Sequence, residues 1–416
     1  MKNHHVSCCL YLFEGFMDKS VKRQVERIAR NAKKAKEGLV KQIKAHKEAN
    51  GTMQLDRHFS KTQLYKLPHL SKGIVEKEYE DMVKEGHVFK KNDNGIGFQI
   101  SVDEVLEIYK RRNIPTFKER KKCPIVAAIA NLKGGVTKSV STVSLAHGLR
   151  THPSLICEDL KILVIDLDPQ STATLLLSFE KSIGEVEDTA VQTMLHDVSK
   201  EELINECIIS SAIDGVDVLP ANIGDAFIAA DWESYCGDQL PKLNPYEVLY
   251  KTVIDKLGDT YTHYLIDNGP HLDAFLENTL QCVDALLVPL PPSNVDLHAS
   301  CNFLERMPSM FETLEEKGVE VRLKSLIGFM TKFNDKDEDN LDARTMAKDM
   351  FGGSLLDVNI IDSKAFEVSA ETFDSVISVS RKNYDGDKKT LKRVQDNVLS
   401  FSRSVFDHLK HISEDK

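Results

Sequence analysis

NLKGGVTKS, residues Asn131 to Ser139, is the stretch from which the fold can be read. Its last part, Gly-Gly-x-x-Lys-Ser, is similar to a phosphate-binding loop, but the usual spacing is G-x-x-x-x-G-K-[S/T], with glycine directly before the lysine. Here Thr137 stands in the place of that glycine, and a second lysine, Lys133, precedes the two glycines. The stretch is therefore either a chance match or a variant loop in which the extra lysine has its own function.

The sequence around the stretch favours a variant loop. An apolar run over 125–130 precedes it and a helical pattern over 139–150 follows it, which is the strand–loop–helix order that a phosphate loop requires. In that order, backbone N–H groups and the helix N-terminus face the phosphates. Lys138 is expected to reach the β- and γ-phosphates of a nucleotide, and the hydroxyl of Ser139 to hold Mg²⁺. The expected nucleotide-binding residues of the loop are Lys133, Gly134, Gly135, Val136, Thr137, Lys138, Ser139 and Val140.

Two further apolar runs end in carboxylates. Residues 161–165 are followed by Asp166 and Asp168, and residues 263–266 are followed by Asp267. Because ligands of open α/β sheets bind beyond the carboxyl ends of the strands, these side chains are expected to converge on the loop. A metal–triphosphate site needs one carboxylate for the metal and another to position the attacking water. Helix capping is the alternative role for such residues.

From residue 123 onward, short apolar runs alternate with helical patterns. This alternation is typical of an α/β fold, in which a mostly parallel sheet carries helices on both faces. The predicted strands are 125–130, 161–165, 216–219, 263–266, 285–290, 326–330 and 355–360. An amphipathic helix is expected over 391–412, either packed on the sheet or acting as a membrane anchor.

The N-terminal part has a different pattern. Residues 18–48 carry apolar and small side chains at the spacing of a coiled coil, so we expect a dimerisation helix within 1–50, or else a helix packed along the chain's next domain. Basic residues outnumber acidic ones in 17–50, whereas the whole chain has a net charge of −10. This contrast predicts an anionic partner such as nucleic acid, with a solvated helix face as the alternative.

Residues 51–122 are predicted to form a winged helix-turn-helix domain and a linker. Ser60 and Ser71 stand where the caps of two helices are expected, and a hairpin over 88–100 is predicted around an Asn-Gly turn. The second helix would enter DNA, although its acidic residues would repel DNA, so a protein–protein module is the alternative. The expected DNA contacts here are Ser71, Lys72, Lys90 and Lys91.

The sequence also bears on whether the protein spans a membrane or binds a metal. No apolar run reaches the roughly 18 residues of a membrane span, so no membrane is expected as a partner. The eight cysteines include no C-x-x-C pair, which gives little support to a zinc or iron–sulfur site and suits a reducing cytosol. The helical pattern begins only after Met17, which is a second candidate for the first residue.

The motifs KGGVTKS, ILVIDLDPQSTAT and YLIDNGPHLDAF, followed by LLVPLPPSNVD, resemble the deviant Walker A, A′ and B motifs of ParA/SopA-type plasmid partition ATPases. The long form of that family adds an N-terminal helix and a helix-turn-helix, as here. The resemblance covers nearly the whole chain from about Met17. It implies that 123–416 is a deviant Walker P-loop ATPase domain, which binds ATP or ADP with Mg²⁺ and converts ATP to ADP and phosphate.

The resemblance also implies roles for individual residues. Lys133 would cross an ATP-bound homodimer to the phosphates of the second copy, while Lys138 would act on its own nucleotide. Asp168 would orient the attacking water, and Asp267 would join Ser139 at the metal. The implied catalytic set is Lys133, Lys138, Asp168 and Asp267, and the pair that matches the adenine-contacting region is Thr331 and Lys332.

The resemblance further implies a cytoplasmic, nucleoid-associated protein whose ATP-bound dimers bind DNA non-specifically. A ParB-like centromere-binding protein would stimulate hydrolysis, and the ADP form would repress its own operator through the winged domain. The sequence departs from the family pattern at four places. Thr137, Val140 and Asn268 replace the usual glycine, threonine and threonine, and Ile361-Asp362 stands where a DNA-binding Pro-Arg pair is frequent, with Lys364 nearby.

Besides a DNA-segregating ATPase, two interpretations of the whole chain are open at this point. One is an ATP/ADP-gated transcription repressor with no transport role, which the helix-turn-helix pattern supports. The other is a MinD-like membrane-positioning ATPase, in which the helix over 391–412 would be the anchor.

Overall fold

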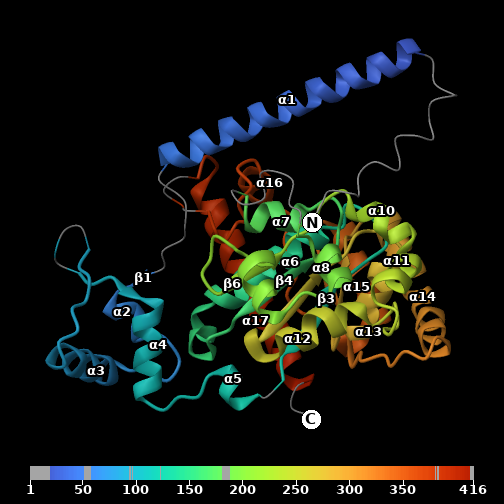
Figure 1. The fold of residues 1–416 in the computed structure, drawn as a ribbon. Coiled ribbons are helices and arrows are strands. Elements are labelled where there is room, and N and C mark those ends of the chain that lie inside the picture. Colours follow the sequence, from blue (N-terminus) through green and yellow to red (C-terminus); the bar gives the residue numbers. More distant parts are fainter. Residues whose placement is uncertain are drawn as a thin grey trace. The chain divides into compact units, whose positions relative to one another are not determined.

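The computed structural model describes residues 19–50, 58–92, 95, 97–121, 123–179, 188–379, 381 and 384–412 of the chain. The chain divides into two compact units, Met1–Met53 and Gln54–Lys416. Of the described residues, the first unit contributes one helix, α1 (Lys19–Asn50), and the second contributes every other element (Figure 1).

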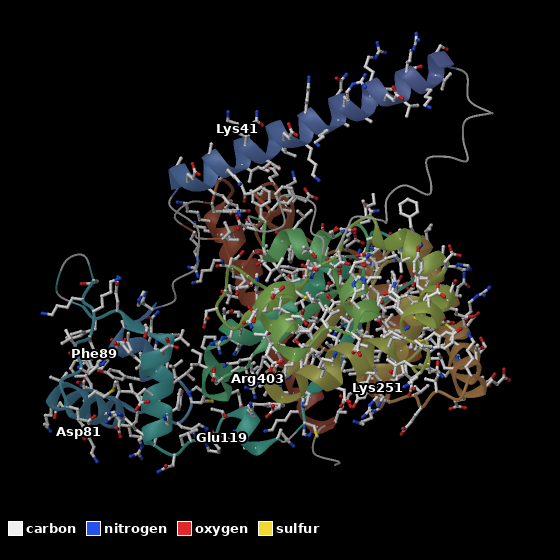
Figure 2. All side chains as sticks on the ribbon, in the orientation of Figure 1. Lys41, Asp81, Phe89, Glu119, Lys251 and Arg403 are labelled. Atoms are coloured by element: carbon white, nitrogen blue, oxygen red, sulfur yellow. The ribbon has the colours of Figure 1, made fainter. Side chains whose placement is uncertain are left out.

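Helix α1 confirms the long helix that the sequence predicts over 18–48. It has 32 residues and therefore spans about 48 Å at the usual rise of an α-helix. Basic side chains such as Lys41 project from it (Figure 2). Four of its apolar side chains are exposed, namely Val21, Val25, Ile28 and Leu39. An apolar seam of this kind is what a second helix would cover in a coiled coil.

A small helix-turn-helix domain opens the second unit. Helices α2 (Lys61–Leu64), α3 (Lys72–Lys84) and α4 (Val102–Arg111) pack around an apolar core, and β1 (His58–Phe59) pairs antiparallel with β2 (Ile100–Ser101). The serine before each helix accepts a hydrogen bond from a backbone N–H group of the first turn, which fixes where the helix begins. The predicted second helix is thus observed as α3.

The predicted wing follows α3 as a narrow hairpin. Lys91 pairs with Phe98 in an antiparallel bridge, and the N–H of Asn92 donates to the carbonyl of Gly97 at 2.8 Å. Gly95 has a φ of 71°, the positive value that an Asn-Gly turn uses. Residues 93, 94 and 96 of the turn lie outside the described residues.

The larger domain is built on a seven-stranded sheet with the order β5-β6-β4-β7-β3-β8-β9. Its strands are β3 (Ile125–Ile129), β4 (Ile162–Asp166), β5 (Ile209–Ser210), β6 (Val216–Leu219), β7 (His263–Asp267), β8 (Ala285–Leu290) and β9 (Ser325–Met330). All neighbouring strands are parallel except β5 and β6 at one edge. Four central strands, β3, β4, β7 and β8, are buried along their whole length, which explains their continuous apolar sequences. The predicted mostly parallel sheet is confirmed.

Helices cover both faces of this sheet, and an apolar core forms on each face. One face packs against α6 (Lys138–Thr151), α7 (Thr172–Leu177), α16 (Lys364–Ala370) and α17 (Lys388–Ile412). The other packs against α8 (Ala190–His196), α11 (Trp232–Gln239), α13 (Ala274–Cys282), α14 (Asn294–Glu316) and α15 (Glu338–Phe351). The shorter helical segments are α5 (Phe117–Arg120), η1 (Pro153–Glu158), α9 (Lys200–Glu202), η2 (Leu203–Cys207), α10 (Asp225–Ala230), η3 (Tyr250–Ile254), α12 (Asp255–Leu257), η4 (Gly258–Thr260) and η5 (Gly352–Ser354).

The strand predicted over 355–360 is wrong. The segment makes only isolated parallel bridges beside β9, from Leu355 to Gly328 and from Ile361 to Phe333. Its backbone bends at Asp357 and Val358, so the regular ladder of hydrogen bonds is interrupted. The apolar residues of the segment therefore bury Leu356 and Ile360 but do not keep the backbone extended.

Helix α17 confirms the amphipathic helix predicted over 391–412, and its apolar stripe is buried in the core beside α6. The two helices approach so closely at Gly148 that a Cβ atom there would lie 2.0 Å from the Ser402 hydroxyl oxygen. The stripe is thus occupied by the protein's own core rather than free to enter a lipid surface. Within the described part of the chain, no helix is long and apolar enough to cross a membrane.

We expect Gly148→Ala to lower the free energy of unfolding by roughly 1–3 kcal/mol, because the added methyl group overpacks the α6–α17 contact. Chemical denaturation measures the change. Gly237→Ala in α11 is the matched control, since no atom lies within 4 Å of its added Cβ. The double variant Gly148→Ala/Ser402→Gly should recover most of the loss, and no recovery would show that the contact is not the cause.

Candidate active site

The loop between β3 and α6 has the backbone of a phosphate loop. Gly135 has a φ of 77° and Thr137 a φ of 69°, so both lie in the left-handed region that favours glycine. Thr137 thus has a conformation that glycine adopts without strain, at a cost of about 1–2 kcal/mol for a residue with a Cβ. Its hydroxyl donates to the carbonyl of Val136 at 2.5 Å, which turns the side chain back onto its own loop.

Lys138 is the first residue of α6 and is buried. Its ammonium donates to the carbonyl of Lys133 at 3.0 Å and therefore curls over the loop. Burial lowers the pKa of Lys138, and the negative charges of Asp267 and Asp168 oppose that effect. The lysine therefore lies within electrostatic reach of Asp168 and Asp267, two of the three carboxylates that follow the predicted strands.

Lys133 has a different environment from Lys138. Its backbone N–H donates to the Asn131 side chain at 3.0 Å, and Asn131 in turn donates to Ser300 of α14, which anchors the start of the loop. The Lys133 ammonium lies 3.4 Å from a carboxylate oxygen of Asp296, in the first turn of α14, and 37% of the side chain is exposed. One lysine of the loop is thus held inside the site, while the other lies at its surface.

Asp267 ends β7 beside the loop and is fully buried. Its Oδ1 accepts from the hydroxyl of Thr142 in α6 at 3.1 Å. Burial raises the pKa of Asp267 well above its usual range, and the neighbouring charge of Asp166 adds to this, whereas the hydroxyls of Ser139 and Thr142 oppose it. Such a carboxylate stays ionised only if a cation or further donors reach it.

Asp166 organises the loop after β4. It accepts hydrogen bonds from the N–H of Asp168 at 3.1 Å and from the hydroxyl of Thr174 at 2.7 Å. Burial raises the pKa of Asp166 to about 7. These bonds place Asp168 at the sheet edge, where a Cβ on Gly269 of the β7 loop would lie 3.5 Å from its Oδ1. The carboxylates that follow β4 and β7 are therefore brought together, as the sequence predicts.

The residues present fit a divalent cation with oxygen ligands. The Oδ2 atom of Asp267 is buried and has no hydrogen-bond partner in the described structure, and Ser139 interacts with the same carboxylate. Among the described residues, no group of three or more His, Cys, Asp or Glu side chains is arranged to hold a metal ion. A cation at Asp267 and Ser139 would therefore need phosphate or water oxygens as well, which is how Mg²⁺ is usually held.

Thr331 and Lys332 follow β9 and also approach the loop. Lys332 has a φ of 50°, and its ammonium donates to the carbonyl of Gly135 at 3.0 Å. Thr331 is fully buried, and its hydroxyl has no hydrogen-bond partner among the described residues. Val140 lies in the first turn of α6 and packs partly on the core. These positions border the site, while a contact with adenine stays a prediction.

The predicted DNA contacts lie on two parts of the chain. Ser71 caps α3 by accepting from the N–H of Ile74, and Lys72 beside it is exposed. Lys90 and Lys91 are exposed on the hairpin. Lys364 is exposed at the start of α16, and Asp362 two residues before it is exposed as well. The structure does not bring Lys364 into the helix-turn-helix domain, so these residues form two separate candidate surfaces.

The acidic residues of α3 are less repulsive to DNA than the sequence suggests. Glu76 accepts from Lys61 at 2.7 Å and from the hydroxyl of Tyr65 at 2.5 Å. Glu78 is buried and lies 3.8 Å from Arg112. Two of the four carboxylates are thus turned toward cations of the same domain, which removes part of the objection to α3 as a DNA-binding helix.

Sequence reasoning missed several residues that shape this site. Asn131 accepts from the backbone of the loop, and Thr142 donates to the buried carboxylate of Asp267. Asp296 pairs with the exposed Lys133. The only signal for Asn131 is its place at the end of the apolar strand. Thr142 lies four residues after Lys138, which puts it on the same face of the helix. The pairing of Lys133 with Asp296 bridges segments that are distant in sequence and left no local signal.

The fold and the site define a P-loop nucleoside triphosphatase that carries a helix-turn-helix domain. A family model for an AAA domain matches residues 125–318, and a model for a ParA helix turn helix domain matches residues 32–121. Plasmid partition protein A of Escherichia coli is 42% identical over 391 residues, which cover 94% of this chain and 98% of that protein. The chain therefore belongs to the ParA family of plasmid partition ATPases.

Solved structures agree with this assignment. A partition protein superposes with a TM-score of 0.75 and 34% identity, over 94% of this chain and 98% of that one. Cobyrinic acid a,c-diamide synthase from Mycobacterium smegmatis, solved with bound ADP and magnesium, has a TM-score of 0.51 and 20% identity over 69% of this chain and 96% of that one. The second likeness concerns the fold alone.

Thr137→Gly is expected to raise the free energy of unfolding by up to about 1 kcal/mol, because it removes a Cβ from a left-handed position. Gly135→Ala is the matched opposite change, and since its added Cβ meets no atom within 4 Å, its cost of about 1–2 kcal/mol would be conformational. Chemical denaturation of both variants tests the pair. A loss of stability in Thr137→Gly would show that the threonine hydroxyl outweighs the strain.

Proposed function

We propose that this protein segregates DNA by a cycle in which ATP brings two copies together and hydrolysis to ADP and phosphate separates them. The observation that carries the proposal is the contrast between two lysines of one loop. Lys138 is buried and bonded to its own loop, whereas Lys133 is held at the surface by Asp296. A lysine at the mouth of the site is placed to leave Asp296 for the phosphates of a second copy.

Within one copy, we propose a role for each residue of the site. Lys138 would stabilise charge on the β- and γ-phosphates, and Asp168 would hold the attacking water. Ser139 and Asp267 would hold Mg²⁺, which would offset the negative charge that develops on the phosphates. Thr331 and Lys332 would border the base. The proposed division of the chain is a dimerisation helix in 1–50, a DNA-binding domain and linker in 51–122, and the ATPase domain in 123–416.

Lys133→Ala is expected to leave ATP binding by the monomer near the wild-type level but to abolish ATP-dependent dimerisation. Lys138→Ala should instead lower the hydrolysis rate by about 10²–10³ through weaker stabilisation of phosphate charge. Calorimetry with a non-hydrolysable ATP analogue and analytical ultracentrifugation separate the two effects. Lys161→Ala is the control, since Lys161 is exposed and precedes the start of β4, whose other end carries Asp166. A Lys133→Ala protein that still dimerises with ATP contradicts the proposed role.

Two DNA-binding surfaces are proposed, one for each mode of binding. The helix-turn-helix domain would bind the operator in the ADP form, through α3 and the hairpin lysines. Non-specific DNA would bind the ATP dimer at a basic surface near α16 and the start of α17. There Asp362 stands where the family has an arginine, but Lys364 lies close by in sequence and four exposed basic residues open α17, namely Lys388, Lys389, Lys392 and Arg393.

Crossed variants test this division. Lys392→Ala/Arg393→Ala should weaken ATP-dependent binding to random duplex and reduce the slope of its salt dependence by about one per residue. Lys90→Ala/Lys91→Ala should weaken operator binding with ADP and leave random-duplex binding unchanged. Fluorescence anisotropy over a salt series measures both. If either pair of substitutions weakens both modes equally, the two modes share one surface.

We further propose that a ParB-like centromere-binding protein stimulates hydrolysis and that the protein works in the cytoplasm on nucleoid DNA. The helix-turn-helix domain also favours a second candidate, a nucleotide-gated transcription repressor without a transport role. A plasmid-loss assay separates the two. Loss of plasmid in a Lys133→Ala strain that still represses the operator supports segregation, and stable inheritance in that strain supports repression alone.

A further inference from the structure

The apolar core of the helix-turn-helix domain is completed by two residues of the ATPase domain. Ile156 and Cys157 belong to η1, which follows α6 after the single residue His152. Both side chains are buried in the cluster that α3 and α4 line, and η1 contacts α4 directly. Helix α6 thus begins at the phosphate loop, and the segment that follows it, η1, packs in the core of the DNA-binding domain.

Tyr109 connects this contact to the helix-turn-helix itself. It lies on the α4 surface of the same cluster and is fully buried. Its hydroxyl donates to the carbonyl of Pro68 at 2.8 Å, and Pro68 lies in the turn between α2 and α3. A displacement of η1 would therefore act on Tyr109, whose hydroxyl is hydrogen-bonded to the turn before α3, the proposed DNA-binding helix.

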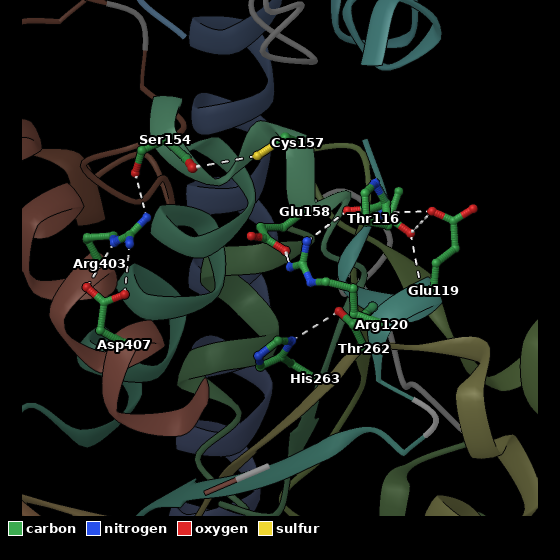
Figure 3. A network of polar contacts seen from close by, with 11 residues as sticks. Thr116, Glu119, Arg120, Ser154, Cys157, Glu158, Thr262, His263, Arg403 and Asp407 are labelled. Atoms are coloured by element: carbon green, nitrogen blue, oxygen red, sulfur yellow. Dashed lines mark hydrogen bonds and ion pairs between the residues drawn. The ribbon is translucent and has the colours of Figure 1, made fainter. Parts of the chain in front are cut away.

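Polar contacts hold η1 at both ends (Figure 3). At its start, Arg403 of α17 donates to the hydroxyl of Ser154 at 2.9 Å while it is paired with Asp407. At its end, Glu158 pairs with Arg120 of α5, and Arg120 also donates to the carbonyl of Pro115 at 2.8 Å. The segment is therefore bound to the linker and to the core helix α17 at the same time.

The linker is itself fixed to the ATPase domain. Phe117, next to the capped start of α5, is buried with its ring 5.0 Å from the ring of His263 and 6.1 Å from that of Phe406. Helix α6 has no room to slip past α17, because Gly148 lies against Ser402. A shift of α6 at the phosphate loop would therefore reach η1, about 21 Å away along the helix, and the packed core would absorb little of the movement.

We propose that η1 and the Arg120–Glu158 pair form the joint through which the nucleotide at the phosphate loop sets the orientation of the helix-turn-helix domain. This inference rests on the proposed function, because it supplies the regulation of its operator binding. The pair suits the role because 12% of the Glu158 side chain and 34% of the Arg120 side chain are exposed. Removing one partner leaves a partly buried charge without its counter-ion and loosens one end of η1.

A purely structural role for the pair makes a different prediction from a coupling role. If the pair only stabilises the linker, its loss lowers operator affinity equally with and without ADP. If it couples the sites, its loss reduces the ratio of the two affinities. Because coupling is reciprocal, operator DNA must then also lose its effect on ADP affinity.

The test measures operator Kd by fluorescence anisotropy with ADP and without nucleotide, and ADP Kd by calorimetry with and without operator DNA. In full-length Arg120→Ala and Glu158→Gln proteins, we expect the ADP-dependent ratio of operator affinities to fall at least about fivefold toward one. The charge-exchanged variant Arg120→Glu/Glu158→Arg should recover part of the ratio. Arg111→Ala removes a similar pair, with Glu85, that does not involve η1, and it should leave the ratio unchanged.

The outcomes separate this inference from the function on which it rests. A wild-type ratio of one overturns nucleotide-gated operator binding and the joint with it. A wild-type ratio above one that persists in folded Arg120→Ala and Glu158→Gln proteins overturns the joint alone. Thermal melting checks the folding of each variant. If Arg120→Ala does not fold, Arg120→Gln removes the charge that pairs with Glu158 but keeps a hydrogen-bond donor, and an unchanged ratio there also overturns the joint.

Discussion

The packing of α6 between the sheet and α17 is the constraint on which the rest of the structure depends. Eleven of its 14 residues are buried, including Lys138 at its first position and His147 near its middle. Burial lowers the pKa of His147 to about 3, and its Nδ1 lies 2.8 Å from the Ser375 hydroxyl, so the ring is a neutral part of the core. A helix with so many buried residues moves only together with its neighbours, so α6 and the elements packed on it behave as one rigid body.

This rigidity allows charged side chains to be held close together in the buried part of the site. Asp168 and Asp267 face one buried ammonium, that of Lys138, and Asp166 adds its negative charge beside Asp267. The buried part of the site therefore carries more negative than positive charge when its carboxylates are ionised, which disfavours a bare phosphate there. A phosphate that arrives with a divalent cation meets balanced charge, which is the physical reason for assigning Asp267 and Ser139 to the cation and Lys138 to the phosphates.

Local patterns predicted the parts of the molecule that depend on local physics. Continuous apolar runs gave the buried strands, capping serines gave the helix starts in the helix-turn-helix domain, and the loop motif gave the lysines. Features set by distant contacts were not predictable in this way. The two-residue strand β5 forms only because it pairs with β6. The segment 355–360 bends despite its apolar residues. Asp296 pairs with Lys133 although the two residues lie far apart in the sequence.

The burial of Ile156 and Cys157 is also set by distant contacts, here between two domains. In the sequence they follow the first helix of the ATPase domain, yet they are buried in the core of the helix-turn-helix domain. A domain of about 60 residues buries only about 60% of its surface and is marginally stable alone, so two apolar side chains from outside are a substantial addition. The same contact ties the position of the domain to the segment that follows α6. The stability of the helix-turn-helix domain and the coupling proposed for it therefore depend on one packing arrangement.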